Sequence, residues 1–265
     1  MLTKNNILST LSTLGVPPGA VVTVHTSLKS IGEIEGGGET LLEALIEYFT
    51  QDGGLLVVPT HTWARLDTPE LATLDLSEPY TNLGVLPTLA LRDGRGVRSM
   101  HPTHSVVVFG DDAENFARCD DNTDTFASPD GCYGELYRRG GYILLIGVGN
   151  DKNTFIHCVE EMLGVENRNA DKKIRTTVKH TDGHIRERML YPMYTEGCDD
   201  ISDYFPKYDA AFSYLGVESH GKLGNAEVRL ISAVGVKEAM EKIYHASNRS
   251  EVLLCDGEIP TEYYK

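Results

Sequence analysis

The sequence predicts an α/β protein: a layered α/β/α arrangement with a central mixed sheet and an added antiparallel hairpin. Short apolar runs at residues 20–24, 54–59 and 142–148 have the length and composition of buried strands, and polar turns and helical patterns follow them. This alternation is typical of parallel βα units. Residues 174–178 and 185–190 also have strand character, and Thr181-Asp-Gly183 between them is a hairpin signal that adds antiparallel pairing.

The remaining elements are predicted from periodicity and stop signals. Residues 3–14 carry apolar positions at helical spacing and end at Gly15, with two prolines beyond. By the same criteria we expect helices at residues 39–49, 83–92, 155–163 and 236–245, a partly exposed helix within 199–214, and strands at 106–109, 224–232 and 252–255.

Length and composition are those of an ordinary globular protein. The chain has 265 residues, of which 41% are hydrophobic and 24% charged. A chain of this length can bury a full core as one large domain. We therefore expect a single domain over residues 1–265, with room for a small subdomain around 165–222.

The charge is strongly negative. The 24 Lys and Arg residues against 39 Asp and Glu residues give a formal net charge of −15. Such a charge opposes nonspecific binding to nucleic acid and to anionic membranes, and it attracts a cationic small molecule such as an amine. Solubility alone explains much of the same charge. No apolar run approaches the roughly 18 residues of a membrane helix, so we expect neither a nucleic-acid nor a membrane partner.

The cysteines predict a reducing compartment. Cys119, Cys132, Cys158, Cys198 and Cys255 are odd in number and never form a Cys-x-x-Cys pair. The chain does not open with a basic and then apolar leader. Reduced thiols and a cytoplasmic location are the resulting predictions.

The stretch around His157 has the composition of a reactive site. An apolar strand ends at Val148, polar turn residues follow, and His157 falls in the first turn of the next helix. Glu160 lies three positions later on the same helix face, and Asp151 lies in the turn before it. A histidine with available carboxylates can serve as a general base. The alternative is a capped surface helix with a solvated acidic face.

Two other stretches lie at predicted strand ends. His25-Thr-Ser-Leu28 follows the first strand, and Gly36-Gly-Gly38 precedes the helix that starts near Glu39. Glycines let backbone amides approach a ligand, and a helix N-terminus favours a phosphate, but a flexible connector has the same composition. His101 and His104 flank Pro102 in a non-helical link, where they suggest metal ligands only weakly, because no third ligand has an obvious spacing.

Taken together, these motifs resemble the aminoglycoside 3-N-acetyltransferase family, also called the antibiotic N-acetyltransferase family. The resemblance is carried by His25-Thr-Ser-Leu28, the glycine loop before Glu39-Thr40, Arg98-Ser-x-His-Pro-x-His-Ser105, Ser128-Pro129 and Thr154-x-x-His-x-x-Glu160, in this order. It implies an α/β/α fold, acetyl-CoA as the donor, and acetyl transfer to an amine of an aminoglycoside without a metal. Thr88 departs from the pattern, since an acidic residue is expected in its segment.

The resemblance also implies roles for particular residues. His157 matches the family's catalytic histidine, and Asp151 and Glu160 match its acidic partners. The implied cofactor-binding residues are His25, Thr26, Ser27, Leu28, Gly36, Gly37, Gly38, Ser99, His104, Ser105 and Ser128.

The primary prediction is therefore an acetyl-CoA-dependent N-acetyltransferase that acts on the 3-amino group of an aminoglycoside or related amino sugar and confers resistance. Alternatives are the same chemistry on a non-antibiotic cellular amine, a metal-assisted hydrolase that uses His61, His101 and His104, and a coenzyme A-binding protein without catalysis. Acids between residues 199 and 209 are candidate contacts of a cationic acceptor, and a homodimer is left open.

Overall fold

The computed structural model describes residues 1–265, and its central sheet has seven strands in the order β4-β5-β2-β1-β6-β10-β9. The strands are β1 (Val21–Thr26), β2 (Leu55–Pro59), β4 (Val97–Arg98), β5 (Val106–Phe109), β6 (Tyr142–Ile146), β9 (Glu218–Leu223) and β10 (Ala226–Ser232). β1 pairs in parallel with both β2 and β6, and the other pairs are antiparallel. The predicted mixed sheet is confirmed.

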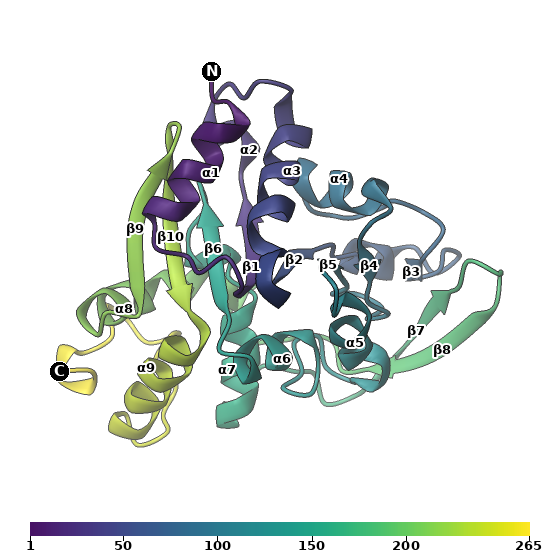
Figure 1. Cartoon of the computed structure of the whole chain (residues 1–265). Helices are drawn as coiled ribbons and strands as arrows, with labels where there is room; N and C mark the ends of the chain where they lie inside the picture. Colours follow the sequence, from purple (N-terminus) through teal and green to yellow (C-terminus); the bar gives the residue numbers. More distant parts are fainter.

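Helices cover both faces of this sheet (Figure 1). One face carries α1 (Lys4–Thr13), α2 (Leu28–Ile31), α3 (Gly37–Phe49) and α4 (Val85–Asp93), and the other carries α5 (Ala113–Ala117), α6 (Cys132–Arg138), α7 (Phe155–Leu163), α8 (Asp209–Tyr214) and α9 (Ala233–Ala246). Alternate residues of the central strands enter opposite cores, as Val21 and Val22 do. The α/β/α layering is therefore confirmed.

The predicted hairpin lies in a second, smaller sheet that projects from the main body (Figure 1). β7 (Ile174–Lys179) and β8 (Ile185–Leu190) pair antiparallel, and β3 (Leu74–Asp75) adds to β7 in parallel. Gly183 in the connecting turn has a φ of 87°, which favours glycine. The subdomain at residues 165–222 stays a prediction. Within that range the hairpin belongs to the second sheet, whereas β9, which begins there, belongs to the central one.

Two expectations about local structure need correction, and one strand was missed. Residues 199–214 form a 3₁₀ helix (Ile201–Tyr208) followed by α8, because Pro206 lacks the amide that one continuous helix requires. Residues 252–255 form no strand, since the amides of Leu253 and Leu254 donate to the side chain of Glu251. β9 was not predicted, because its glycine and charged residues lack apolar alternation. None of the helices combines the length and apolar character needed to cross a bilayer.

Candidate active site

A cavity of about 520 Å³ lies where the parallel strands end. The parallel strands end at Thr26 in β1, Pro59 in β2 and Ile146 in β6. The loops at these ends lie together at one edge of the sheet. The polar residues in the cavity wall are His25, His61, Asp67, Thr103, His104, Asp151, Lys152, Asn153, Thr154, His157, Tyr191, Asp200 and Ser202. Residues far apart in the sequence therefore share one site.

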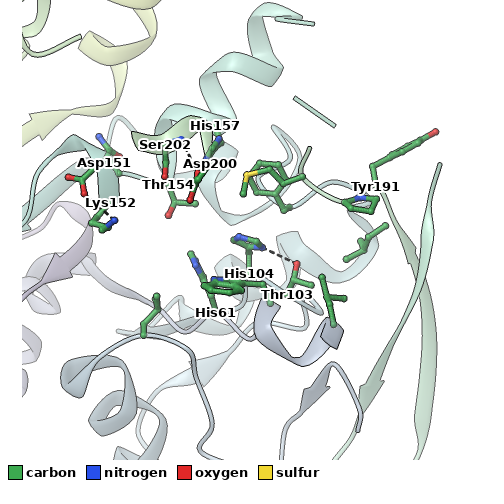
Figure 2. Close-up of a pocket in the computed structure, with 18 of the residues that line it drawn as sticks. His61, Thr103, His104, Asp151, Lys152, Thr154, His157, Tyr191, Asp200 and Ser202 are labelled. Carbon is green, nitrogen blue, oxygen red and sulfur yellow. Dashed lines mark hydrogen bonds and ion pairs between the residues drawn. The ribbon is translucent and has the colours of Figure 1, made fainter. Parts of the chain in front are cut away.

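His157 lies in the first turn of α7 and is 8% exposed. Its ring packs edge-on against Phe126 and Phe205, with centroid distances of 4.9 and 4.7 Å. Nδ1 lies 3.5 Å from Oε2 of Glu160, and neither atom has a hydrogen-bond partner. Figure 2 shows His157 beside Thr154 and Asp200, across the cavity from His61 and His104. A proton on Nδ1 would face Glu160, which leaves Nε2 as the nitrogen with a free lone pair.

The two carboxylates expected near His157 differ in position. Glu160 is 1% exposed, and its other oxygen accepts a 2.6 Å hydrogen bond from Arg168 Nε. Asp151 also lines the cavity, but its ion pair is with Lys152, at 3.1 Å. Glu160 is therefore the carboxylate that can orient the imidazole, and a role for Asp151 stays a prediction.

The other cavity histidines are neutral at pH 7. Burial lowers the pKa of His25 to about 4. Burial also lowers the pKa values of His61 and His104 well below 6.5, and the neighbouring histidines lower them further. The rings of His61 and His104 lie 4.4 Å apart, and His61 Nε2 lies 3.1 Å from the hydroxyl of Tyr133. These groups form a polar wall that carries no charge.

His101 is fully engaged outside the cavity. Its Nδ1 accepts from the amides of Thr103 and His104, at 3.2 and 2.9 Å. Nε2 must therefore carry the proton, and it donates to the Thr125 carbonyl at 2.9 Å. No group of three or more His, Cys, Asp or Glu side chains is arranged to hold a metal. This arrangement weighs against the hydrolase alternative, because one of its three ligands has no free nitrogen.

Three acids line the cavity: Asp67, Asp151 and Asp200. Asp200 belongs to the acidic segment expected to meet an acceptor, whereas Asp209 of the same segment pairs with Arg229 at 2.7 Å. Thr88 is not in the cavity wall, and its hydroxyl donates to the Gly84 carbonyl. Asp67 was not among the site residues predicted from the sequence. Its position shortly after Thr60-His-Thr-Trp63, at the end of β2, is the feature that could have indicated it.

Several residues implied for cofactor binding lie outside this cavity. Only His25 and His104 of that set line it. Ser99 Oγ donates to Asp120 at 2.5 Å, Ser105 Oγ donates to the Thr60 carbonyl at 3.0 Å, and Ser128 Oγ accepts from the amide of Asp130 at 3.2 Å. These three hydroxyls hold loops together next to the cavity.

The glycine loop and the turn after β1 lie on the α2–α3 side. Ser27 is the residue before α2 and makes no side-chain capping bond, Leu28 packs against the core on this side, and Thr26 Oγ1 is buried without a partner. Gly36 and Gly37 have φ values of 74° and 70°, which require glycine. A Cβ on Gly38 would lie 2.8 Å from Leu89, so this glycine allows α3 to pack against α4. The amides of Gly38 and Glu39 at the start of α3 have no partner.

Comparison with known proteins gives a consistent result over most of the chain. A family model described as aminoglycoside 3-N-acetyltransferase matches residues 23–245. An aminoglycoside N(3)-acetyltransferase IV from Salmonella sp is 34% identical over 229 residues, which cover 86% of this chain and 82% of the relative. The SPbeta prophage-derived aminoglycoside N(3')-acetyltransferase-like protein YokD of Bacillus subtilis is 26% identical, with 91% of each chain covered.

Solved structures agree with the sequence relatives. A histidine-to-alanine mutant of the aminoglycoside acetyltransferase AAC(3)-IVa in complex with a gentamicin is 25% identical and has a TM-score of 0.75, with 93% of this chain and 90% of that chain covered. AAC-IIIb in a binary complex with CoASH is 21% identical with a TM-score of 0.75, with 90% and 94% covered, which shows a shared fold.

Proposed function

The chain belongs to the aminoglycoside 3-N-acetyltransferase family, and from this premise we propose how its cavity works. Members of the family are enzymes that use acetyl-CoA as co-substrate. In our proposal the chain acetylates the 3-amino group of an aminoglycoside or related amino sugar and thereby confers resistance. The observation that carries it is His157, a buried cavity histidine whose one nitrogen faces a buried carboxylate.

The proposed role of His157 is that of the general base. An aminoglycoside amine is largely protonated near pH 7, and attack on a thioester needs a neutral amine. The ammonium first loses one proton to solvent. Nε2 of His157 then takes a second proton from the amine as the C–N bond forms and the C–S bond breaks, and it can return that proton to the thiolate. Glu160 favours the Nδ1–H tautomer and stabilises the imidazolium that forms.

For the acceptor, Asp67, Asp151 and Asp200 supply negative charge around the cavity. A polycation with several ammonium groups can pair with more than one of them while one amine reaches His157. The formal charge of −15 adds long-range attraction, which salt screens. Tyr191 and Trp63 in the same wall offer flat surfaces to the sugar rings.

For the donor, acetyl-CoA supplies an activated acyl group. His25 and His104 line the cavity and would lie near its acyl end. The unpartnered amides of Gly38 and Glu39, with the Thr26-Ser27 turn, would hold its phosphates, since backbone amides at a helix start favour anions. Gly37→Val should then weaken coenzyme A binding in calorimetry, because a β-branched residue does not readily adopt the left-handed backbone that presents these amides; unchanged affinity in a folded variant would place the phosphates elsewhere.

Cytoplasmic location is also part of the proposal. It is supported by five free cysteines, of which Cys132 and Cys158 are buried. A homodimer stays a prediction.

The decisive experiment measures thiol release from acetyl-CoA with a panel of amines. We expect turnover with aminoglycosides, lowered about 10²–10⁴-fold by His157→Ala. Turnover with a cellular polyamine alone would favour the non-antibiotic acceptor, and coenzyme A binding without turnover on any amine would favour the non-catalytic alternative. Product analysis by NMR identifies the acetylated amine.

A further inference from the structure

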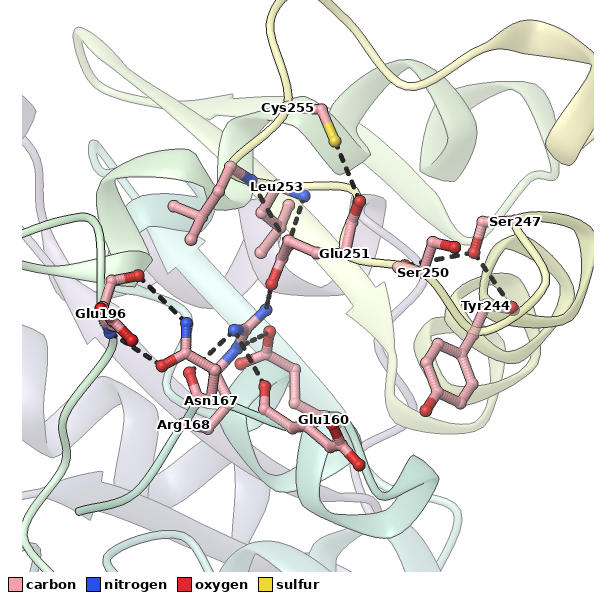
Figure 3. Close-up of polar contacts among 12 residues, drawn as sticks. Glu160, Asn167, Arg168, Glu196, Tyr244, Ser247, Ser250, Glu251, Leu253 and Cys255 are labelled. Carbon is pink, nitrogen blue, oxygen red and sulfur yellow. Dashed lines mark hydrogen bonds and ion pairs between the residues drawn. The ribbon is translucent and has the colours of Figure 1, made fainter. Parts of the chain in front are cut away.

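Arg168 is a buried arginine that the proposed chemistry does not use. Its side chain is 7% exposed, and every edge of its guanidinium is bound (Figure 3). Nε donates to Glu160 Oε1 at 2.6 Å, and Nη2 lies 2.9 Å from Glu251 Oε2. Nη1 donates to the carbonyls of Glu166 and Asn167, at 3.3 and 3.0 Å. This side chain therefore joins two carboxylates from distant parts of the chain.

The segment that carries Arg168 is held by residues 194–196. The side-chain amide of Asn167 bonds both the amide and the carbonyl of Glu196, at 2.8 and 3.0 Å. The Arg168 carbonyl accepts from the amide of Tyr194 at 3.2 Å. Residues 190–193, just before this contact, form part of the cavity wall. The position of Arg168 is thus set by the same segment that encloses the cavity.

Glu251 lies in the segment after α9 and is 31% exposed. One of its oxygens binds Arg168, and the other accepts from the amides of Leu253 and Leu254, at 2.7 and 3.3 Å. Leu253 is fully buried in the larger core. The carboxylate of Glu251 is therefore held in place by backbone as well as by charge.

The hydrogen bond from Arg168 fixes the orientation of the Glu160 carboxylate. Because Arg168 occupies Oε1, only Oε2 is left to face Nδ1 of His157 at 3.5 Å. Two carboxylates and one guanidinium leave this cluster with one net negative charge, which a protonated His157 would neutralise. Without Arg168, a buried carboxylate would lose its partner and the rotamer that aims it at His157.

We propose that Arg168 and Glu251 are positioning residues for acetyl transfer: Arg168 aims the Glu160 carboxylate at His157, and Glu251 holds Arg168 and supplies the balancing negative charge. The inference rests on the proposed role of His157 as the base. It extends the catalytic apparatus to the C-terminal segment, far from the cavity in sequence.

The other ionisable groups near His157 are accounted for. His61 and His104 are neutral because burial lowers their pKa values well below 6.5. Burial and the nearby Glu160 raise the pKa of Tyr208, which keeps it protonated. Asp151, Lys152 and Asp200 line the cavity and are not changed in the Arg168 and Glu251 variants. Differences between the pH profiles of these variants therefore do not come from them.

The first test is a double-mutant cycle on kcat. Arg168→Met should lower kcat about 10-fold in the natural chain and less than about 2-fold in a Glu160→Gln background, with the KM for acetyl-CoA nearly constant. Arg139→Met is the matched control, because Arg139 also joins two carboxylates, Glu135 and Asp112, both at 2.7 Å, outside the cavity. Equal losses from Arg168→Met in both backgrounds would overturn the proposal.

The second test uses the sign of a pH shift. Arg168→Met removes a positive charge, so the acidic limb of kcat/KM should move to higher pH. Glu251→Gln removes a negative charge, so the same limb should move to lower pH. NMR titration of the His157 ring in the free protein should show both shifts, and Arg139→Met should show neither. Shifts of the same sign in both variants, or no shift, would contradict the proposal that the charges of Arg168 and Glu251 act on His157.

Folding failure is separable from a catalytic effect. Circular dichroism shows whether Arg168→Met folds. If it does not, two milder variants replace it: Arg168→Lys keeps the charge with a single contact, and Glu251→Gln alters a partly exposed group. Both must lower kcat for the proposal to stand. If His157→Ala retains turnover, the proposed base is wrong. If His157→Ala and Glu160→Gln lose turnover while the Arg168 and Glu251 variants keep it, only this inference is wrong.

Discussion

His101 and His157 are both buried histidines, yet their surroundings differ in the feature that decides reactivity. Both nitrogens of His101 are bound to backbone groups: Nδ1 accepts two amide hydrogen bonds and Nε2 donates to the Thr125 carbonyl. His157 instead presents Nδ1 to the buried Glu160 at 3.5 Å, and its ring lines the cavity. Burial alone therefore does not make a histidine a candidate base; the proposal for His157 rests on its carboxylate neighbour and on a ring nitrogen not bound to backbone.

The largest expected difference between the two is in turnover. His157→Ala should lower kcat about 10²–10⁴-fold, because general-base assistance is typically worth that much. Coenzyme A affinity by calorimetry should be nearly intact, and circular dichroism should show a folded protein. A variant that keeps most of its turnover at pH 7 would show that the base lies elsewhere or that the amine arrives already neutral.

The neutral histidines can be separated from the base by acid unfolding. The folded pKa of His25 is about 4, below the unfolded value of about 6.5, so the folded state resists its protonation. Its contribution is fully present above pH 6.5 and is lost as pH falls toward 4, at up to about 1.4 kcal/mol per pH unit. Urea unfolding of His25→Gln should show a shallower loss in this window; an unchanged slope would mean that His25 is protonated in the folded protein.

His101→Ala should act on stability and leave the chemistry in place. The substitution leaves the Thr125 carbonyl and the amides of Thr103 and His104 without their hydrogen-bond partner. A buried unsatisfied group costs about 1–3 kcal/mol. We expect the free energy of unfolding to fall by at least about 2 kcal/mol in urea, while kcat of the folded fraction changes far less than in His157→Ala. A loss of turnover as large as that of His157→Ala would give His101 a catalytic role.

The smallest expected effect concerns the acidic wall. Asp200→Asn should raise the KM for a polycationic acceptor a few-fold at low salt, and the difference should shrink as salt screens the charge. Asp203→Asn is the control, since Asp203 is exposed in the 3₁₀ helix that Asp200 caps but does not line the cavity. Identical effects of the two substitutions would rule out a direct contact at Asp200.

Local patterning predicted most of the fold. Apolar runs predicted β1, β2 and β6, and the turn at Gly183 predicted the hairpin. The strand predicted at 252–255 was wrong because a side chain, that of Glu251, binds the amides that a strand would use. Propensity describes neighbours in sequence, and it does not include such contacts.

For the site, the sequence by itself determined one pairing: His157 in the first turn of a helix, with Glu160 three residues later on the same face. Helix geometry makes that pairing local, so spacing is enough to find it. Only the tertiary structure decided what surrounds the pair. Arg168 binds Glu160 and is itself held by Glu251, and His61 and Asp67 share the cavity with His157, because sheet topology and loop packing bring residues distant in the chain together.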